Sequence, residues 1–358
     1  MFIIKIALIG CYPPPYGGIS IHVKRLKIVL DNNNIENVVF NDKIEDLKNS
    51  IKKDSLKKTF LKLIYLKYNV LHFHIINKKG RMLIPIYRLL GKKVILTVHG
   101  ESLIDQIKES NFIEKKILLN GLKRLNKIIT VNPKTNMELI DLGVNKNKLV
   151  TIPAYINPIK DSKDYNLIPK EVYNFINSSN FLISVNGWIR FYKKEDLYGI
   201  DLSIELINKL INSGYNVSLF IALLGIEEQN HKEKEYYLEL KNKIKKYNLE
   251  KYIFIYEVNN TEFYPILEKS NLFIRPTNID GDAISIREAL YYKIPTIASD
   301  VVIRPKEVIL FKNRDLNNLY SKVIYVMKNY KEYKEKIKDL DIEDNSNKIL
   351  KIYKNLTN

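Results

Sequence analysis

The sequence of 358 residues has one cysteine, Cys11, and lacks long uninterrupted apolar runs. A single cysteine cannot close a disulfide within the chain and excludes a cysteine-ligated metal cluster, so a reducing, cytoplasmic environment is expected. No apolar run reaches the roughly 18–20 residues that a membrane-spanning helix needs. The pattern G-x-G-x-x-G is also missing, which argues against a dinucleotide cofactor.

The positive charge of the chain is strongly uneven. The 58 Lys and Arg exceed the 40 Asp and Glu, giving a net charge of +18. Residues 1–160 carry a net charge of +16, whereas residues 161–358 carry only +2. A basic half favours anionic partners: lipid headgroups, a phosphorylated substrate or nucleic acid.

The two halves of the chain repeat one order of predicted elements. Lys5 to Gly10 is a predicted strand, followed by a loop that ends in Gly17-Gly18 and by a helix. Phe181 to Val185 opens the same order of strand, glycine-containing loop and helix. Such alternation builds parallel sheets covered by helices. We therefore predict an α/β fold with two Rossmann-like, doubly wound domains facing a cleft.

A hinge that contains two prolines, residues 153–158, separates these halves. The predicted domains are residues 1–158 and residues 159–330. Residues 331–358 are predicted to form a C-terminal helical tail that crosses back to the first domain.

Two basic helices are predicted in the first half, over Ile44 to Asn69 and Ile113 to Asn126. In the first of them, lysines alternate with leucine, isoleucine and phenylalanine, which makes it amphipathic. Such a helix can lie on an anionic membrane, but a surface helix with solvated lysines has the same pattern. Both interpretations stay open.

Three histidines lie on or after predicted strands of the first half. His72 and His74 share one face of the strand from Val70 to Ile76, but no nearby acidic residue or cysteine completes a metal-binding set. His99 follows the strand from Lys93 to Val98, where open α/β sheets bind their ligands. His99 is therefore the histidine for which we predict a function, and no metal is expected.

The stretch from Asn278 to Asp300 combines a polar loop, a short helix and a strand. Asp280 precedes the helix, and Glu288 lies on its second turn. The free N–H groups at a helix N-terminus favour an anion such as phosphate. Ser285 and Glu288 also match a capping box, which would satisfy those N–H groups without a ligand. Asp280-Gly281-Asp282 spells D-x-D, a metal–diphosphate motif, but the helix and strand that follow argue against that use.

Several segments resemble the family-4 retaining glycosyltransferases, which have the two-domain GT-B fold and include the glycosyl transferases group 1. The resemblance covers most of the chain. It rests on PPYGGISIHV near the start, TVHG, IPAYINP, NGWIRFYKKEDLYGID and, most specifically, DGDAISIREALYYKIPTIASD at residues 280–300.

The resemblance implies roles for individual residues. Gly17 and Gly18 would approach the donor diphosphate, and His99 would lie near the transferred sugar. Asp280 replaces the family's first glutamate, near the sugar hydroxyls, and Glu288 is the second, which binds ribose. The backbone of Ala283, Ile284 and Ser285 would hold phosphate oxygens. The implied catalytic set is His99, Asp280 and Glu288.

The family's usual basic pair is missing. Trp188 and Tyr198 stand where the family has arginine and lysine, so Arg190, Lys193 or Lys194 must supply the positive charge. Arg190 is preferred, because arginine grips a diphosphate bidentately, with Lys194 as a further donor-binding residue. Arg304 has no family role; a ligand contact and a surface arginine are equally compatible with the sequence.

By this resemblance the first domain lies on the acceptor side and the second binds the nucleotide sugar. The function expected is metal-independent, retaining hexosyl transfer from a nucleotide-diphosphate sugar, with UDP as the nucleotide, to a lipid-linked precursor of a cell-surface polysaccharide. No cofactor and no nucleic acid are expected as partners. The enzyme would be cytoplasmic and peripheral on the inner face of the membrane. A sugar-nucleotide epimerase of the same fold is one alternative. The other is a non-enzymatic protein that binds nucleic acid or an anionic surface.

Overall fold

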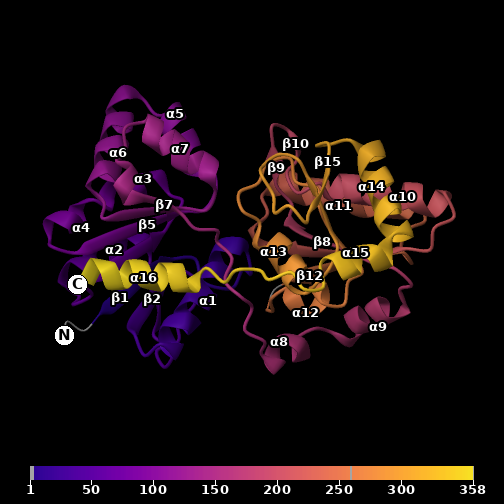
Figure 1. Cartoon of the computed structure of the whole chain (residues 1–358), viewed down its shortest axis with the longest axis horizontal. Coiled ribbons are helices and arrows are strands. Elements are labelled where there is room, and N and C mark those ends of the chain that lie inside the picture. The colour runs from indigo at the N-terminus through magenta and orange to yellow at the C-terminus, as the bar shows by residue number, and fades with distance from the viewer. Residues whose placement is uncertain (1–3, 259, 358) are drawn as a thin grey trace. The chain divides into compact units, whose positions relative to one another are not determined.

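The computed structural model describes residues 4–258 and 260–357, which form two compact units. Unit 1 comprises the chain up to Asn157 together with the segment from Asp344 onward, and unit 2 comprises Pro158–Glu343. The chain therefore leaves unit 1 after Asn157 and returns to it near its C-terminus (Figure 1).

Unit 1 contains a seven-stranded parallel sheet with the strand order β3-β2-β1-β4-β5-β6-β7. Both faces of its central strands are buried, which explains their continuous apolar runs. The strand bounds are β1 Lys5–Gly10, β2 Glu36–Asn41, β3 Ile51–Lys53, β4 Val70–His74, β5 Lys93–Val98, β6 Lys127–Thr130 and β7 Leu149–Thr151.

Helices connect successive strands of this sheet, except between β2 and β3, where residues 42–50 form a loop. Their bounds are α1 Gly18–Asn32, α2 Leu56–Tyr65, α3 Lys78–Leu83, α4 Ile86–Leu89, α5 Ser102–Glu109, α6 Phe112–Arg124 and α7 Pro133–Asp141. A short 3-10 helix, η1, spans Lys146–Lys148.

The last helix, α16 (Ser346–Thr357), belongs to unit 1 and covers its sheet. Tyr353 is fully buried, and its hydroxyl lies 2.6 Å from Nδ1 of His72 on β4. Asn345, just before the helix, donates to the carbonyl of Tyr155 at 3.1 Å. The tail expected at 331–358 is thus divided: α15 stays in unit 2, and α16 is part of unit 1.

Unit 2 repeats this design with a six-stranded parallel sheet in the order β12-β11-β8-β13-β14-β15. A two-stranded antiparallel hairpin is inserted after β8. The strand bounds are β8 Leu182–Trp188, β9 Phe191–Tyr192, β10 Glu195–Asp196, β11 Ser218–Leu224, β12 Ile253–Val258, β13 Leu272–Arg275, β14 Thr296–Ser299 and β15 Ile309–Phe311.

The helices of unit 2 bury apolar stripes against this sheet. Ile204, Ile207 and Leu210 of α10 pack with Val323 and Val326 of α14 in one cluster. The bounds are α8 Ser162–Asn166, α9 Lys170–Ser178, α10 Ile200–Asn212, α11 His231–Lys246, α12 Tyr264–Leu267, α13 Ile284–Tyr291, α14 Leu316–Lys328 and α15 Tyr330–Lys336, with the 3-10 helix η2 at Ile226–Glu228.

Two parallel sheets flanked by helices confirm the predicted pair of Rossmann-like domains. One predicted element is wrong: the basic helix over 44–69 is interrupted by β3, and α2 begins only after Ser55, whose side chain caps it. Ile51 is buried as part of the sheet edge. The second basic helix is confirmed as α6.

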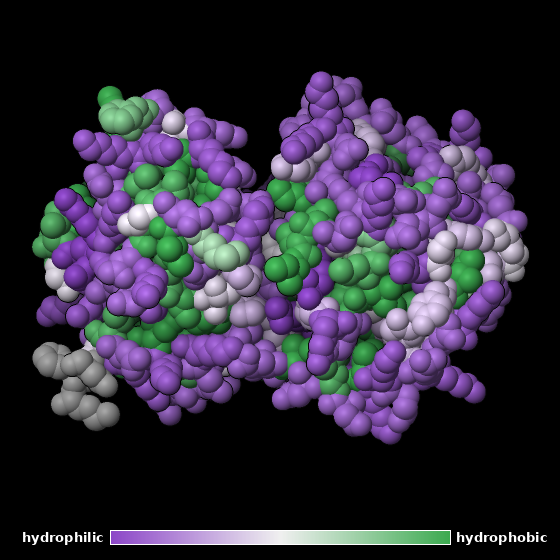
Figure 2. Space-filling model, turned by 45° about the horizontal axis from the view of Figure 1, so that its top comes forward, coloured by the Kyte–Doolittle hydropathy of each residue, from purple (hydrophilic) through white to green (hydrophobic). Residues whose placement is uncertain are grey.

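The surface in view in Figure 2 is mostly hydrophilic, with apolar side chains exposed in patches on both units. Within the described residues, no helix combines the length and apolar character required to cross a bilayer.

Candidate functional site

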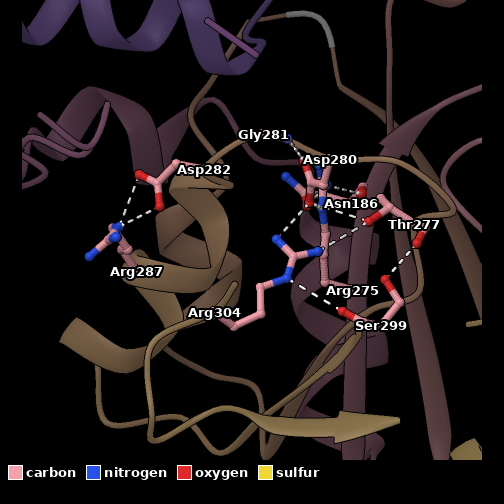
Figure 3. Close-up of polar contacts among 9 residues, drawn as sticks. All are labelled: Asn186, Arg275, Thr277, Asp280, Gly281, Asp282, Arg287, Ser299 and Arg304. Atoms are coloured by element: carbon pink, nitrogen blue, oxygen red, sulfur yellow. Dashed lines mark hydrogen bonds and ion pairs between the residues drawn. The ribbon is translucent and has the colours of Figure 1, made fainter. Parts of the chain in front are cut away.

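The site in unit 2 lies where its strand order reverses. After β8, the chain forms β11 and β12 on one side of β8. It then forms β13, β14 and β15 on the other side. Ligands of open α/β sheets bind beyond the carboxyl ends of the strands at such a switch point. Arg275 is the last residue of β13, and the loop after it leads to α13 (Figure 3).

Asp280, in that loop, is held between two arginines (Figure 3). Its Oδ2 lies 3.2 Å from Nε of Arg275 and 3.0 Å from Nη1 of Arg304. Thr277 donates its hydroxyl to the same oxygen at 3.2 Å, and the N–H of Gly281 donates to Oδ1 at 3.0 Å. The carboxylate therefore fixes both guanidinium groups in place.

This cluster retains a positive charge. Burial alone would favour the neutral carboxyl, but Arg275 and Arg304 hold the pKa of Asp280 at about 2. One ionised carboxylate then neutralises only one of two guanidinium groups. A buried cluster with an excess positive charge is suited to an anion.

Sequence reasoning missed Arg275 and left Arg304 without a role. The side chain of Arg304 is 2% exposed, so the interpretation as a surface arginine is wrong. Arg275 also donates to the carbonyl oxygen of Asn186 on β8 at 3.1 Å. The sequence did contain a signal for Arg275, because it is an arginine at the carboxyl end of the apolar strand Leu272–Arg275. Ligands of open α/β sheets bind at that end of the strands.

The N-terminus of α13 presents backbone donors next to this cluster. Ala283 is the N-cap residue in extended conformation, and among the described contacts no side chain caps the helix. The capping box expected from Ser285 and Glu288 is therefore wrong, because Ser285 is already inside the helix. Nε of Arg287 donates to the carboxylate of Asp282 at 2.8 Å.

The other predicted residues of α13 follow from this start. Ile284 and Ser285 form the first turn of the helix. Glu288 lies one turn further along and is buried. The structure thus brings Asp280, Ala283, Ile284, Ser285 and Glu288 onto one loop and helix.

The loop between β8 and α10 forms the hairpin β9–β10, which accounts for its extra length. Lys193 and Lys194 occupy the turn, both with positive φ, and are exposed. Arg190 is already paired, with Nη1 2.6 Å from Oε2 of Glu233 and its guanidinium 5.2 Å from the Trp188 ring. Its predicted role at the diphosphate would compete with this ion pair.

The remaining predicted residues lie in unit 1. Gly17 is the N-cap of α1, Gly18 its first residue, and the N–H of Gly17 donates to the hydroxyl of Ser20 at 3.0 Å. His99 follows β5 and is half-buried.

His99 belongs to a group of histidines that the sequence did not reveal. His22 on α1 and His74 at the end of β4 lie with it, at ring-centroid separations of 5.1–5.3 Å. One ring nitrogen from each of the three lies within 4.8 Å of the others. His22, inside the quoted segment PPYGGISIHV, was not singled out because it lies on a helix far along the chain from the other two.

Residues 180–355, which include most of unit 2 and nearly all of α16, match the model of the family described as Glycosyl transferases group 1. The matched segment includes the arginine cluster and the N-terminus of α13. No curated protein matches the chain.

Solved glycosyltransferases share the fold of the whole chain. A glycosyltransferase from Rickettsia africae aligns with a TM-score of 0.71 at 14% identity, covering 99% of both chains. Sucrose-phosphate synthase from Thermosynechococcus elongatus gives 0.71 at 15% identity, again over 99% of both. Anabaena HepE in complex with UDP-glucose gives 0.65 at 12% identity, over 99% of this chain and 98% of its own. At these identities the likeness shows the fold, which is that of GT-B glycosyltransferases.

The arginine cluster predicts a specific pH dependence of stability. The pKa of Asp280 falls from 3.8 to about 2 on folding, so its stabilisation is complete above pH 4 and lost as the pH falls towards 2. Asp280→Asn should lower the free energy of unfolding at pH 7 by about 3 kcal/mol, because two buried arginines lose their counter-charge. The difference in free energy of unfolding between wild type and Asp280→Asn should become smaller between pH 4 and pH 2. Urea unfolding at each pH measures it.

Asp282→Asn provides the matched control, because Asp282 pairs with one arginine in a more accessible position. A constant difference between wild type and Asp280→Asn from pH 7 to pH 2 would contradict the assignment of this pKa.

Proposed function

We propose that the protein transfers a hexose from a UDP-sugar to a lipid-linked glycan precursor, with retention of configuration at the anomeric carbon. The observation that carries this proposal is the pairing of a buried, positively charged arginine cluster with the N-terminus of α13, where the N-cap residue Ala283 has no side chain that could cap the helix. Both lie at the strand-order reversal of unit 2, where open α/β sheets bind nucleotides.

A nucleoside diphosphate is the leaving group that such a site suits. Negative charge builds up on its phosphate as the bond to the sugar breaks, and pre-oriented donors stabilise that charge without reorganisation. The backbone at Ala283, Ile284 and Ser285 would bind phosphate oxygens, and Arg275 and Arg304 would add a net positive charge. These groups supply electrostatic stabilisation at the diphosphate without a metal ion.

Two carboxylates take different roles in this proposal. Glu288 would bind the ribose hydroxyls from α13. Asp280 would contact the sugar hydroxyls, as the resemblance implies, while its oxygens orient the two arginines. The roles predicted for Gly17, Gly18 and His99 in unit 1, and for Arg190 and Lys194 in the hairpin region of unit 2, stay predictions.

Retention follows from attack on the face that the leaving group departs from. The acceptor hydroxyl would approach beside the departing diphosphate, and a phosphate oxygen would take its proton. The protein then contributes chiefly positioning and electrostatics. The UDP-glucose bound by HepE supports uridine as the nucleoside of the donor.

The surface of unit 1 supports a membrane-bound acceptor. An open groove of about 590 Å³ lies between α3, α4 and α6, with an apolar lining that includes Leu83, Leu89, Phe112 and Ile113. Phe112 is 80% exposed, Leu89 74% and Ile113 69%. Lys116 and Arg124 line the same groove.

Apolar side chains next to basic ones, on the half of the chain with a net charge of +16, match an anionic bilayer surface. Apolar residues insert at the level of the acyl chains, and lysine and arginine attract anionic headgroups. We propose this groove as the region that docks on the inner face of the membrane. We therefore assign membrane docking to this groove and not to the long helix expected over 44–69. Only the second half of that segment is helical.

Donor binding tests the nucleotide site. Glu288→Gln should weaken UDP-glucose binding about 10-fold to 100-fold, because hydrogen bonds to a charged group contribute about 1.5–3 kcal/mol. Isothermal titration with UDP-, GDP- and ADP-glucose measures affinity and identifies the nucleoside. Glu332→Gln, on the exposed surface of α15, serves as the control and should bind like wild type.

Unchanged UDP-glucose affinity in a folded Glu288→Gln protein would refute the ribose contact. The mass of the product separates transfer from epimerisation, because an epimerase changes the donor sugar without any acceptor.

Vesicle flotation tests the docking groove. The wild-type protein should float with vesicles of phosphatidylglycerol and phosphatidylcholine, and less with phosphatidylcholine alone, because headgroup charge contributes to binding. The double substitution Phe112→Ser and Ile113→Ser should reduce flotation several-fold. Leu238→Ser removes an apolar side chain of similar exposure from unit 2 and should leave flotation unchanged.

Equal flotation with neutral and anionic vesicles would contradict the electrostatic part of this proposal. Wild-type flotation of the double variant would contradict the groove itself.

A further inference from the structure

Unit 1 has its own strand-order reversal, between β1 and β4. β1 ends at Gly10 and β4 at His74, and these two residues are paired in register. A Cβ on Gly10 would lie 2.8 Å from Cβ of His74, so glycine makes room for the histidine there. The neighbouring strand β5 leads into His99, and α1 contributes His22 from above the same edge.

The ring of His22 is oriented by the backbone. Its Nδ1 lies 2.7 Å from the carbonyl oxygen of Ala154, and since that oxygen only accepts, Nδ1 carries the proton. Nε2 of His22 therefore has a free lone pair. A hydrogen bond from the second ring nitrogen to a carbonyl is the usual way in which proteins orient a metal-binding histidine.

Two buried ring nitrogens in this group have no partner. Nε2 of His22 and Nε2 of His74 are enclosed, without a hydrogen-bond partner among the described residues. The two side chains belong to residues that are 2% and 1% exposed. An unsatisfied buried polar atom is costly, and a bound ion is one way to satisfy it.

All three imidazoles are in the form that binds metals. Burial lowers the pKa of His22 to about 4, and burial together with the neighbouring histidines lowers the pKa values of His74 and His99 well below their ordinary value. Protons therefore compete little for these nitrogens at neutral pH.

We propose that His22, His74 and His99 bind one divalent transition-metal ion of the Zn²⁺ class, with a fourth coordination position left open. Three imidazoles and an open position form the ligand set that zinc uses in several metal centres. A set without carboxylates disfavours Mg²⁺ and Ca²⁺, which prefer oxygen ligands.

The geometry requires a small adjustment. Zn–N bonds of about 2.0–2.1 Å in a tetrahedron separate the nitrogens by about 3.3 Å. The three candidate nitrogens lie within 4.8 Å of one another, so they must approach by up to about 1.5 Å on metal binding. Rotation of the half-buried His99 ring can supply much of this movement. A cavity of about 250 Å³ reaches His74 and gives the ion a route of entry.

Metal binding here does not rest on the proposed function. It would nevertheless regulate that function, because His99 is also the residue predicted to lie near the transferred sugar. A bound ion would occupy the His99 ring and inhibit transfer. Binding of the metal alone and inhibition of transfer are separate measurements, so failure of one is distinguishable from failure of the other.

Zn²⁺ titration calorimetry and Co²⁺ absorption spectroscopy on the full chain test this inference. We expect one saturable site and a visible Co²⁺ spectrum typical of nitrogen ligands. His22→Gln should weaken binding by more than the 10-fold to 100-fold that loss of a residue supporting a ligand costs. Cys11→Ser and His231→Ala remove the exposed thiol and an exposed histidine outside the group, and both should bind like wild type.

Circular dichroism checks that each variant is folded. If His22→Gln does not fold, His99→Gln gives the same test from a more accessible position at a strand end. The proposal is overturned if wild-type protein has no one-to-one site for Zn²⁺ or Co²⁺. It is also overturned if a folded His22→Gln or His99→Gln variant binds as wild type does, or if Cys11→Ser abolishes binding.

Discussion

The ion pairs that Asp280 makes with Arg275 and Arg304 determine how the site in unit 2 is built. Arg275 ends β13 and reaches Asn186 on β8, while Arg304 comes from the segment after β14. One carboxylate therefore joins three segments of the sheet edge. Because it compensates only one of two guanidinium groups, the cluster combines a fixed geometry with an excess of positive charge. Both properties are needed to bind a diphosphate next to a helix N-terminus.

The two units use the same structural principle for different chemistry. In each, residues with chemical function follow parallel strands where the strand order reverses. Unit 2 places arginines and a helix N-terminus there, whereas unit 1 places His74 beside His22 and His99. Parallel sheets bring the carboxyl ends of distant strands together, so residues separated by fifty or more positions become neighbours.

This explains how far the sequence could predict the site. Alternating strands and helices revealed both Rossmann-like domains, and the loop before Ile284 revealed the helix N-terminus, because these features are local. The partners of Asp280 were not predictable in the same way, since Arg304 lies 24 residues further along and contacts it only through folding. His22 was missed for the same reason. The helix expected over 44–69 was wrong because pairing with β2 outweighed the local pattern and made residues 51–53 a strand.

The position of the donor diphosphate tests the central claim most directly. A crystal structure of the full chain with UDP should place phosphate oxygens about 2.7–3.2 Å from backbone N–H groups of Ala283, Ile284 or Ser285, with Arg275 or Arg304 within reach of the same diphosphate. UDP bound with its phosphates away from the N-terminus of α13 would contradict the account.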